Sequence, residues 1–339
     1  MSLVTLLIPI VVLLILASIV AFAIGSNDST MASVVGAKVL SLRSAVIVGG
    51  ILLIIGAVVL GQGVSTTIGS DMIIQPLPAN LVLVISLAMI VWMLLSAYLG
   101  NPISATHSII GSIIGIGLLG ELVWGTPLVR WNTISIIIIG WLLSPILSLA
   151  IAFFLQRYVR RTFLSKTRGL DEIQQREQIF GLLLLVMVIV ICLSRGGNDV
   201  AKAVGLLTMF FVGPIEFTML LLLGGVGMGI GLLVLGRRVV QTVGMELTVL
   251  RPSASFSSAT AGAIVLLVGT ILGIPLAATH ILITSIIGAG MANRVSTNKT
   301  VLRKLILSSL LTVPVSAILA ICIWGIYQLT ISVVFLFPL

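Results

Sequence analysis

Long apolar runs are the feature that most constrains how this chain can fold. Leu81 to Leu95 and Ile134 to Leu155 are examples, and they approach the roughly 20 residues that a helix needs to cross about 30 Å of hydrocarbon. Only 8% of the 339 residues are charged and 59% are hydrophobic, whereas about a quarter of the residues in a soluble domain are charged. The chain is therefore expected to lie in a membrane.

Within lipid, every backbone polar group must be satisfied inside its own element, which favours a helical bundle. The strict alternation that a membrane β-barrel needs is absent. The first segment, Leu3 to Ile24, lacks a basic flank and a small-residue cleavage site, so it is interpreted as a retained helix and not as a signal peptide. The predicted fold class is an all-α, polytopic membrane helical bundle surrounded by lipid.

The net charge of +9 does not indicate a nucleic-acid partner, because no basic block is interleaved with aromatic residues. Basic excess in a membrane protein usually collects in cytoplasmic loops. Cys192 and Cys322 lie in apolar runs and predict no disulfide framework. The sequence leaves a homodimer open.

The two halves of the chain resemble each other in three places that follow the same order, which indicates a duplication. The matches are GSNDSTMASVVG at 25–36 with GGNDVAKAVGLL at 196–207, TTIG at 66–69 with QTVG at 241–244, and NPISATHSIIGSIIG at 101–115 with IPLAATHILITSIIG at 274–288.

Basic residues predict how these repeats are oriented, since each pair of corresponding loops is strongly basic in one half only. The basic members contain Lys38 and Arg43, Arg237 and Arg238, and the residues from Arg294 to Lys304. Under the positive-inside rule, equivalent loops then face opposite sides, so the repeats are inverted. A polar central loop is expected on the cytoplasmic side of the inner (plasma) membrane, with both termini outside.

The chain is thus divided into a first transmembrane repeat at 1–156, a cytoplasmic polar loop at 157–178 and a second, inverted repeat at 179–339. About 10–12 transmembrane helices are expected, some of them broken or re-entrant. Inverted repeats that meet at the middle of the membrane are typical of secondary transporters.

Asp28 and Asp199 are the strongest functional candidates, because an ionisable residue inside a membrane helix is costly. Glycines precede both carboxylates and allow the chain to leave helical geometry there. Freed carbonyls, an asparagine oxygen and a carboxylate are hard ligands that suit a cation. A helix cap is the plainer alternative, but two copies at equivalent positions favour a cation site. The predicted ligands are Asn27, Asp28, Asn198 and Asp199.

Thr66 and Gln241 form a weaker duplicated polar pair that could complete the cation coordination. Arg195 and Lys202 flank the second aspartate, whereas Ile24 and Met31 occupy the equivalent positions of the first half. Arg195 is expected to extend its side chain toward the membrane surface. The role of Lys202 stays open.

The segments PISATH at 102–107 and PLAATH at 275–280 each predict a helix N-terminus, with proline at its start. Free N–H groups and the helix dipole make such a terminus suitable for an anion. Each histidine could donate to the anion, carry a coupled proton or orient a neighbour, although a buried histidine is more often structural. The predicted anion-binding residues are Ser104, Thr106, His107, Thr279 and His280.

These motifs resemble those of the inorganic phosphate transporter family, which carries a duplicated G-x-N-D signature and a Pro-x-Ser/Ala-x-Thr-His element. The resemblance covers residues 20–295. The chain lacks the large central insert of eukaryotic members, so it looks like a compact prokaryotic form. Family members often have glutamate before the Thr of the T-[IV]-G element. Here Thr66 and Gln241 are neutral.

The resemblance implies import of inorganic phosphate by cation symport and alternating access, with no enzymatic activity and no cofactor other than the coupling ions. Neutral oxygen ligands beside the aspartates favour sodium over protons. A proton-coupled phosphate permease and a sulfate permease on the same scaffold are the alternatives. An intramembrane aspartyl protease is more distant, because the Tyr-Asp and Gly-x-Gly-Asp motifs of those enzymes are absent.

Overall fold

The computed structural model describes residues 3–99, 103–165, 167, 169–211, 213–247 and 250–336. Over these ranges the chain is almost wholly helical and contains no β-strand, and a single isolated bridge joins Ile73 to Val129. The prediction of an all-α chain is confirmed.

The helices of the first half are α1 (Leu3–Ser26), α2 (Ala32–Gly36), α3 (Leu42–Thr66) with a π-helical turn (Thr67–Asp71), α4 (Ala79–Tyr98), α5 (Ala105–Leu122) and α6 (Trp131–Val159) with a second π-helical turn (Arg160–Leu164). Those of the second half are α7 (Leu170–Val204) with a 3₁₀ turn (Gly205–Met209), α8 (Pro214–Gly231), α9 (Arg237–Gln241) between π-helical turns (Leu232–Gly236 and Thr242–Leu247), α10 (Pro252–Ile271), α11 (Ala278–Ala292) and α12 (Lys299–Leu336).

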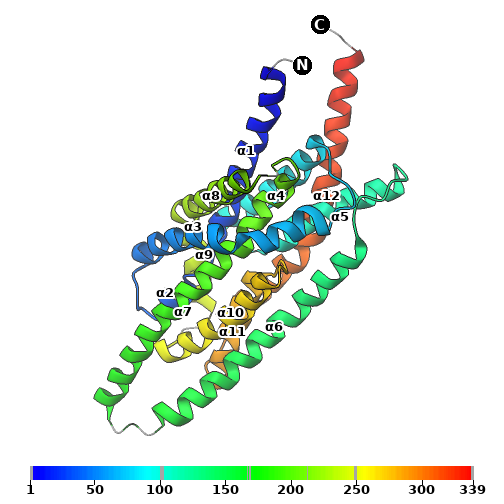
Figure 1. The fold of residues 1–339 in the computed structure, drawn as a ribbon. Helices are drawn as coiled ribbons and strands as arrows, with labels where there is room; N and C mark the ends of the chain where they lie inside the picture. The colour runs from blue at the N-terminus through cyan, green and yellow to red at the C-terminus, as the bar shows by residue number, and fades with distance from the viewer. Residues whose placement is uncertain are drawn as a thin grey trace.

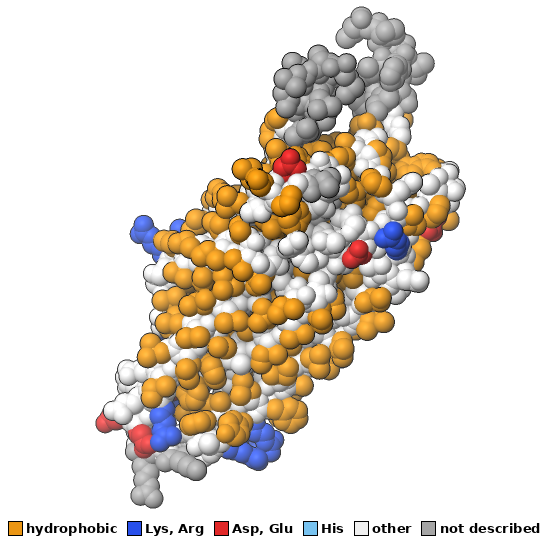
Figure 2. All heavy atoms as spheres, in the orientation of Figure 1, with side chains coloured by type: hydrophobic (Ala, Val, Ile, Leu, Met, Phe, Trp, Pro, Cys, Tyr) orange, Lys and Arg blue, Asp and Glu red, His pale blue; other side chains and the backbone are white. Residues whose placement is uncertain are grey.

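Eight helical segments in the described ranges are long and apolar enough to cross a membrane, and two shorter apolar helices, Val11–Ser26 and Ala278–Ala292, accompany them. The expected number, about 10–12, is reached at its lower end when the shorter two are counted. Hydrophobic side chains cover most of the face in Figure 2, and most of its charged side chains lie toward the two ends. Such a surface fits lipid and not water.

The helices pack in pairs that recur when the two halves are exchanged. Helix α1 packs against α8 and α7 against α3, while α5 packs against α12 and α11 against α6. Figure 1 shows α1 and α7 running in opposite directions, and likewise α6 and α12. The first turn of α1 and the last turn of α12 lie at one end of the bundle, and the end of α6 and the start of α7 lie at the other. This arrangement supports inverted repeats.

Two glycines show how closely the halves approach each other. A Cβ on Gly25 would lie 1.9 Å from the backbone oxygen of Met228, on α8. A Cβ on Gly196 would lie 2.4 Å from the backbone oxygen of Leu53, on α3. No side chain fits at these distances. Gly25 therefore lets α1 pack closely against α8, and Gly196 lets α7 pack closely against α3.

The glycines do not break both helices as the sequence predicts. Helix α1 ends at Ser26, and the chain is irregular before α2 begins at Ala32. Helix α7, by contrast, continues through Gly196 and Gly197 to Val204. The prediction of a second break is wrong, because these two glycines serve close packing against α3 and their backbone stays helical.

Candidate functional site

The two motif aspartates meet where the repeats join, although they come from distant parts of the chain. Asp28 lies in the irregular segment after α1, and Asp199 lies on α7. Both are buried, and both contact one guanidinium: Nε of Arg195 lies 2.9 Å from Oδ2 of Asp28 and 3.0 Å from Oδ2 of Asp199. A single cation therefore joins the equivalent motifs of the two halves.

Arg195 does not extend to the membrane surface, so that prediction is wrong. It is only 4% exposed, because a path to the headgroups would leave Asp28 buried without a cation. Breaking a buried ion pair by removing one partner costs about 3–5 kcal/mol. Arg195 and Asp199 are four residues apart on α7, which places them on one helical face. That spacing is the signal in the sequence for the Arg195–Asp199 pair, and it applies only where α7 is continuous.

Lys202 is a second buried cation, 2% exposed. Its ammonium contacts Oδ1 of Asp199, donates to Oδ1 of Asn198 at 2.9 Å, and lies 3.4 Å from the backbone oxygen of Leu276. All three of these neighbours are oxygen atoms. We refer to Asp28, Arg195, Asn198, Asp199 and Lys202 as the central cluster.

The two motif asparagines connect their helices to the turns that precede α5 and α11. Oδ1 of Asn27 accepts a hydrogen bond from the backbone N–H of Ile103 at 2.8 Å. Nδ2 of Asn198 donates to the backbone oxygen of Ile274 at 3.1 Å and to Oγ1 of Thr270 at 3.4 Å. Each asparagine thus fixes the start of a predicted anion-binding helix to the motif of its own half.

The threonines of the two Thr-His elements make a reciprocal pair of hydrogen bonds across the interface. Oγ1 of Thr106 donates to the backbone oxygen of Leu276 at 2.7 Å, and Oγ1 of Thr279 lies 3.4 Å from the backbone oxygen of Ile103. In each case the acceptor is the equivalent residue of the opposite half. Thr279 also accepts from Nη2 of Arg195 at 3.3 Å. The structure therefore brings the N-termini of α5 and α11 together beside the central cluster.

Ser104 caps α5, since its hydroxyl accepts a hydrogen bond from the backbone N–H of His107 at 3.3 Å. Pro102, which begins the first Thr-His element in the sequence, lies outside the described residues. In the second half, Ala277 is the N-cap of α11 and has no side-chain oxygen to cap it. The N–H groups of Ala278 and His280 donate to the backbone oxygens of Leu276 and Ala277, and the positive end of the helix dipole is suited to an anion.

The two histidines also meet, with ring centroids 4.6 Å apart in an edge-on arrangement. The ring of Trp141 packs on His107 with centroids 4.1 Å apart, and its Nε1 donates to the backbone oxygen of Pro275 at 3.2 Å. Nε2 of His280 is buried and has no hydrogen-bond partner among the described residues. His107 and His280 directly follow Thr106 and Thr279 in the sequence, so the two rings lie close to the predicted anion site.

Thr66 and Gln241 are placed differently from the other predicted cation ligands. Both are exposed, and Oγ1 of Thr66 donates to the backbone oxygen of Gln62 at 3.1 Å. The structure thus brings together Asp28, Asn198 and Asp199, with Asn27 fixed to the adjoining turn, but leaves Thr66 and Gln241 outside the buried cluster.

The charges of the central cluster balance without any added ion, because two carboxylates face one guanidinium and one ammonium. The oxygen ligands of the second motif already surround Lys202. In the first motif, the hydroxyl of Ser29 is buried and has no hydrogen-bond partner among the described residues. In the first motif Asn27 Oδ1 and both oxygens of Asp28 also have partners, so the Ser29 hydroxyl is the oxygen left there for a cation.

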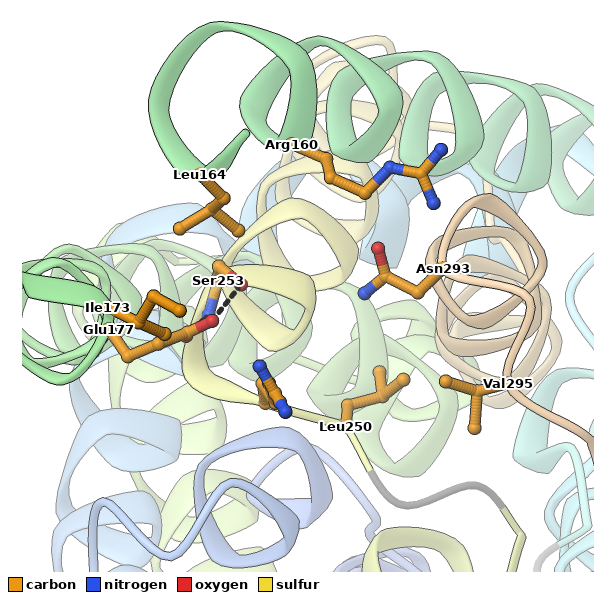
Figure 3. Close-up of a pocket in the computed structure, with 9 residues that line it drawn as sticks. Arg160, Leu164, Ile173, Glu177, Leu250, Ser253, Asn293 and Val295 are labelled. Atoms are coloured by element: carbon orange, nitrogen blue, oxygen red, sulfur yellow. Dashed lines mark hydrogen bonds between the residues drawn. The ribbon is translucent and has the colours of Figure 1, made fainter. Parts of the chain in front are cut away.

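A roomy cavity lies elsewhere, at the end of the bundle where α6 and α7 connect (Figure 3). It has a volume of about 490 Å³ and is lined by residues that include Arg160, Glu177 and Asn293. Glu177 accepts hydrogen bonds from the backbone N–H and the hydroxyl of Ser253, both at 2.8 Å, and so ties α7 to the start of α10. None of the predicted site residues lines this cavity.

Comparison with known proteins places these observations in a family. Residues 24–320 match the model of the phosphate transporter family. A protein of Pyrococcus abyssi named "Putative phosphate permease" is 29% identical, over 92% of this chain and 96% of its own length. The chloroplastic inorganic phosphate transporter 2-1 of Arabidopsis thaliana is 26% identical, over 93% of this chain and 71% of its own.

A solved structure described as the sodium-dependent phosphate transporter has the same fold, with a TM-score of 0.79 and 27% identity. The match covers 95% of this chain and 99% of that one. The relatives are permeases and transporters and not enzymes, which rules out the protease alternative. The chain is a multi-pass membrane protein that belongs to the phosphate transporter family.

Proposed function

We propose that this protein imports inorganic phosphate by cation symport, with sodium as the coupling cation, through alternating access around the central cluster. The observation that carries the proposal is the meeting of both repeated motifs at one buried place, Asp28 with Asp199 and the N-terminus of α5 with that of α11. The description of the solved neighbour as sodium-dependent supports the choice of cation.

In this proposal the anion binds between the starts of α5 and α11, where Ser104, Thr106, His107, Thr279 and His280 lie. Hydroxyls and helix N-termini hold an anion through neutral donors, and the Arg195 guanidinium, which donates to Thr279, adds a positive charge beside them. The threonine hydroxyls now donate to carbonyls of the opposite half. Phosphate oxygens that replaced those carbonyls would break the links between the halves, so binding of the anion would loosen the interface that has to move.

Cation positions are assigned to the oxygen atoms beside the aspartates, one at Asn27 and Asp28 of the first motif and one at Asn198 and Asp199 of the second, with Thr66 and Gln241 as outer members. A cation bound there would sit next to the anion and favour it by direct attraction. Each ion would then stabilise the binding of the other, and reciprocal coupling of this kind is what symport requires.

The topology is part of the proposal: the first repeat at 1–156, the polar segment at 157–178 on the cytoplasmic side of the plasma membrane, the second repeat at 179–339, and both termini outside. Tags at each terminus should be accessible to an impermeant reagent on intact cells, and a tag in the polar segment should not. Labelling of the polar segment in intact cells contradicts this orientation.

The test of function is uptake of labelled phosphate into proteoliposomes, with sodium and pH gradients imposed separately. Accumulation above the external concentration under a sodium gradient alone is expected. A second candidate, uptake driven by protons, is favoured by one observation: Arg195 and Lys202 already balance both aspartates. Accumulation under a pH gradient alone would decide for it, and efficient competition by sulfate would contradict phosphate as the selected anion.

A further inference from the structure

Lys202 lies where the sequence predicts that a mobile cation binds. Its ammonium is surrounded by the carboxylate of Asp199, the amide oxygen of Asn198 and the backbone oxygen of Leu276. Carboxylate, amide and carbonyl oxygens are the ligands expected for a coupling cation such as sodium. We propose that the Lys202 ammonium is a built-in cation that takes the place of one transported sodium ion at the second motif. This inference rests on the proposed cation symport.

The position of Lys202 excludes a sodium ion from the same oxygen atoms. An ammonium and a sodium ion that shared Asp199 and Asn198 would lie in near contact, and their repulsion inside a low-dielectric interior is large. Lys202 is buried and donates to these groups from α7 itself, so it cannot leave the site as a transported ion does. The second motif therefore carries a cationic group that is part of the chain.

The first motif differs from the second at the equivalent positions. Met31 stands where the second half has Lys202, and Ser29 and Ser33 stand where it has Val200 and Val204. Both serine hydroxyls are buried and have no hydrogen-bond partner among the described residues. Buried hydroxyls without partners are costly unless a ligand or water satisfies them.

A small cavity of about 10 Å³ adjoins Ser33 and Ser255, and the hydroxyl of Ser255 also has no partner in the described part of the chain. That volume is about the size of one bound water or small ion. The first motif thus keeps uncommitted hydroxyl oxygen atoms beside Asp28 and the second keeps a cation, which leaves the first motif as the place for a mobile sodium ion.

The test measures sodium binding directly, apart from transport. Purified wild-type protein and the Lys202→Met variant, which carries the residue found at the equivalent position of the first half, are titrated with ²²Na⁺. The wild type is expected to bind one sodium ion per chain and the variant one more. In proteoliposomes the Hill coefficient for sodium should rise from about one to about two. Lys299→Met, at the exposed start of α12, serves as the matched control and should match the wild type.

The proposal is overturned if the wild type binds two sodium ions, or if a folded Lys202→Met variant gains none. Should that variant fail to fold, the number of sodium ions bound by the wild type still tests the proposal. Lys202→Arg keeps the charge and must bind no more sodium than the wild type. The proposed function fails separately: wild-type vesicles that take up no phosphate refute it, whatever the sodium count. A wild type without bound sodium and a variant with one would refute sodium coupling but support the role of Lys202.

Discussion

The two halves of the molecule are interchangeable where their helices pack and different where their charges lie. Gly25 and Gly196 make the same close approach to the opposite half, and Thr106 and Thr279 exchange equivalent hydrogen bonds. Beside the aspartates, however, the second half alone carries Arg195 and Lys202. Packing tolerates little change after a duplication, whereas a difference in charge at the shared site gives the two motifs different tasks.

The largest effect is expected from Arg195→Ile, which gives the second half the residue that the first half has. Asp28 would lose its only described ion-pair partner while staying buried. Removing one partner of a buried ion pair costs about 3–5 kcal/mol. Thermal unfolding in detergent should show a large fall in Tm, and adding Asp28→Asn should restore part of it. An unchanged Tm in the single variant would show that the guanidinium does not hold the halves together.

The next comparison is between the two aspartates. Asp28→Asn and Asp199→Asn should each abolish sodium-dependent phosphate uptake, because Asp28 is a proposed sodium ligand and Asp199 holds the Lys202 ammonium in the second cation position. Their effects on stability should differ: Asp199→Asn leaves both Arg195 and Lys202 without their shared carboxylate, at a cost of about 3–5 kcal/mol. Asp28→Asn should cost less, because Arg195 keeps Asp199. Normal uptake in either variant shows that sodium-coupled transport does not need its carboxylate.

Substitution of Thr106 or Thr279 should lower stability less than the charge changes do, and by similar amounts in the two halves. Thr106→Val and Thr279→Val each remove the donor of a hydrogen bond to a buried carbonyl, which should lower the free energy of unfolding by about 1–3 kcal/mol. Both should also raise the KM for phosphate. Serine at either position keeps the hydroxyl and is the matched control. Equal KM values for Thr106→Val and the wild type would place the anion away from these helix starts.

The smallest effects are expected at Thr66 and Gln241. Since both are exposed, Thr66→Ala and Gln241→Ala should change stability by no more than about 0.5 kcal/mol. Their predicted part in cation coordination would show as a higher sodium concentration for half-maximal uptake. Unaltered sodium dependence in both variants would remove them from the cation site.

The fold and the pairing of the motifs could be predicted because both follow from local patterns. Apolar runs predict spans, and equivalent motifs in inverted repeats are expected to meet, as Asp28 and Asp199 do. The sequence does not predict the role of Arg195, because a glycine pair before an aspartate is also typical of a helix break. Whether Gly196 bends a helix or lets another helix approach depends on what lies opposite, and a single sequence does not show that.

Other features depended on contacts between the halves and had no local signal. The acceptor of Thr106 is a carbonyl 170 positions away in the chain, and no spacing rule connects the two. Thr66 and Gln241 occupy equivalent positions, but duplication alone does not determine which side of a helix faces the interior. Lys202 could be placed only once α7 was known to be continuous.

The close approach of α1 to α8, and of α7 to α3, has a consequence for how the protein is made. When α1 enters the bilayer, the helix that accepts the Gly25 surface has not yet been synthesised, so that surface first faces lipid or the insertion machinery. Neither half can complete its own interior, and two half-length chains made separately should be unstable alone yet associate when produced together. An ancestor of half this length would then have worked as an antiparallel pair, and fusion would have freed each copy to diverge.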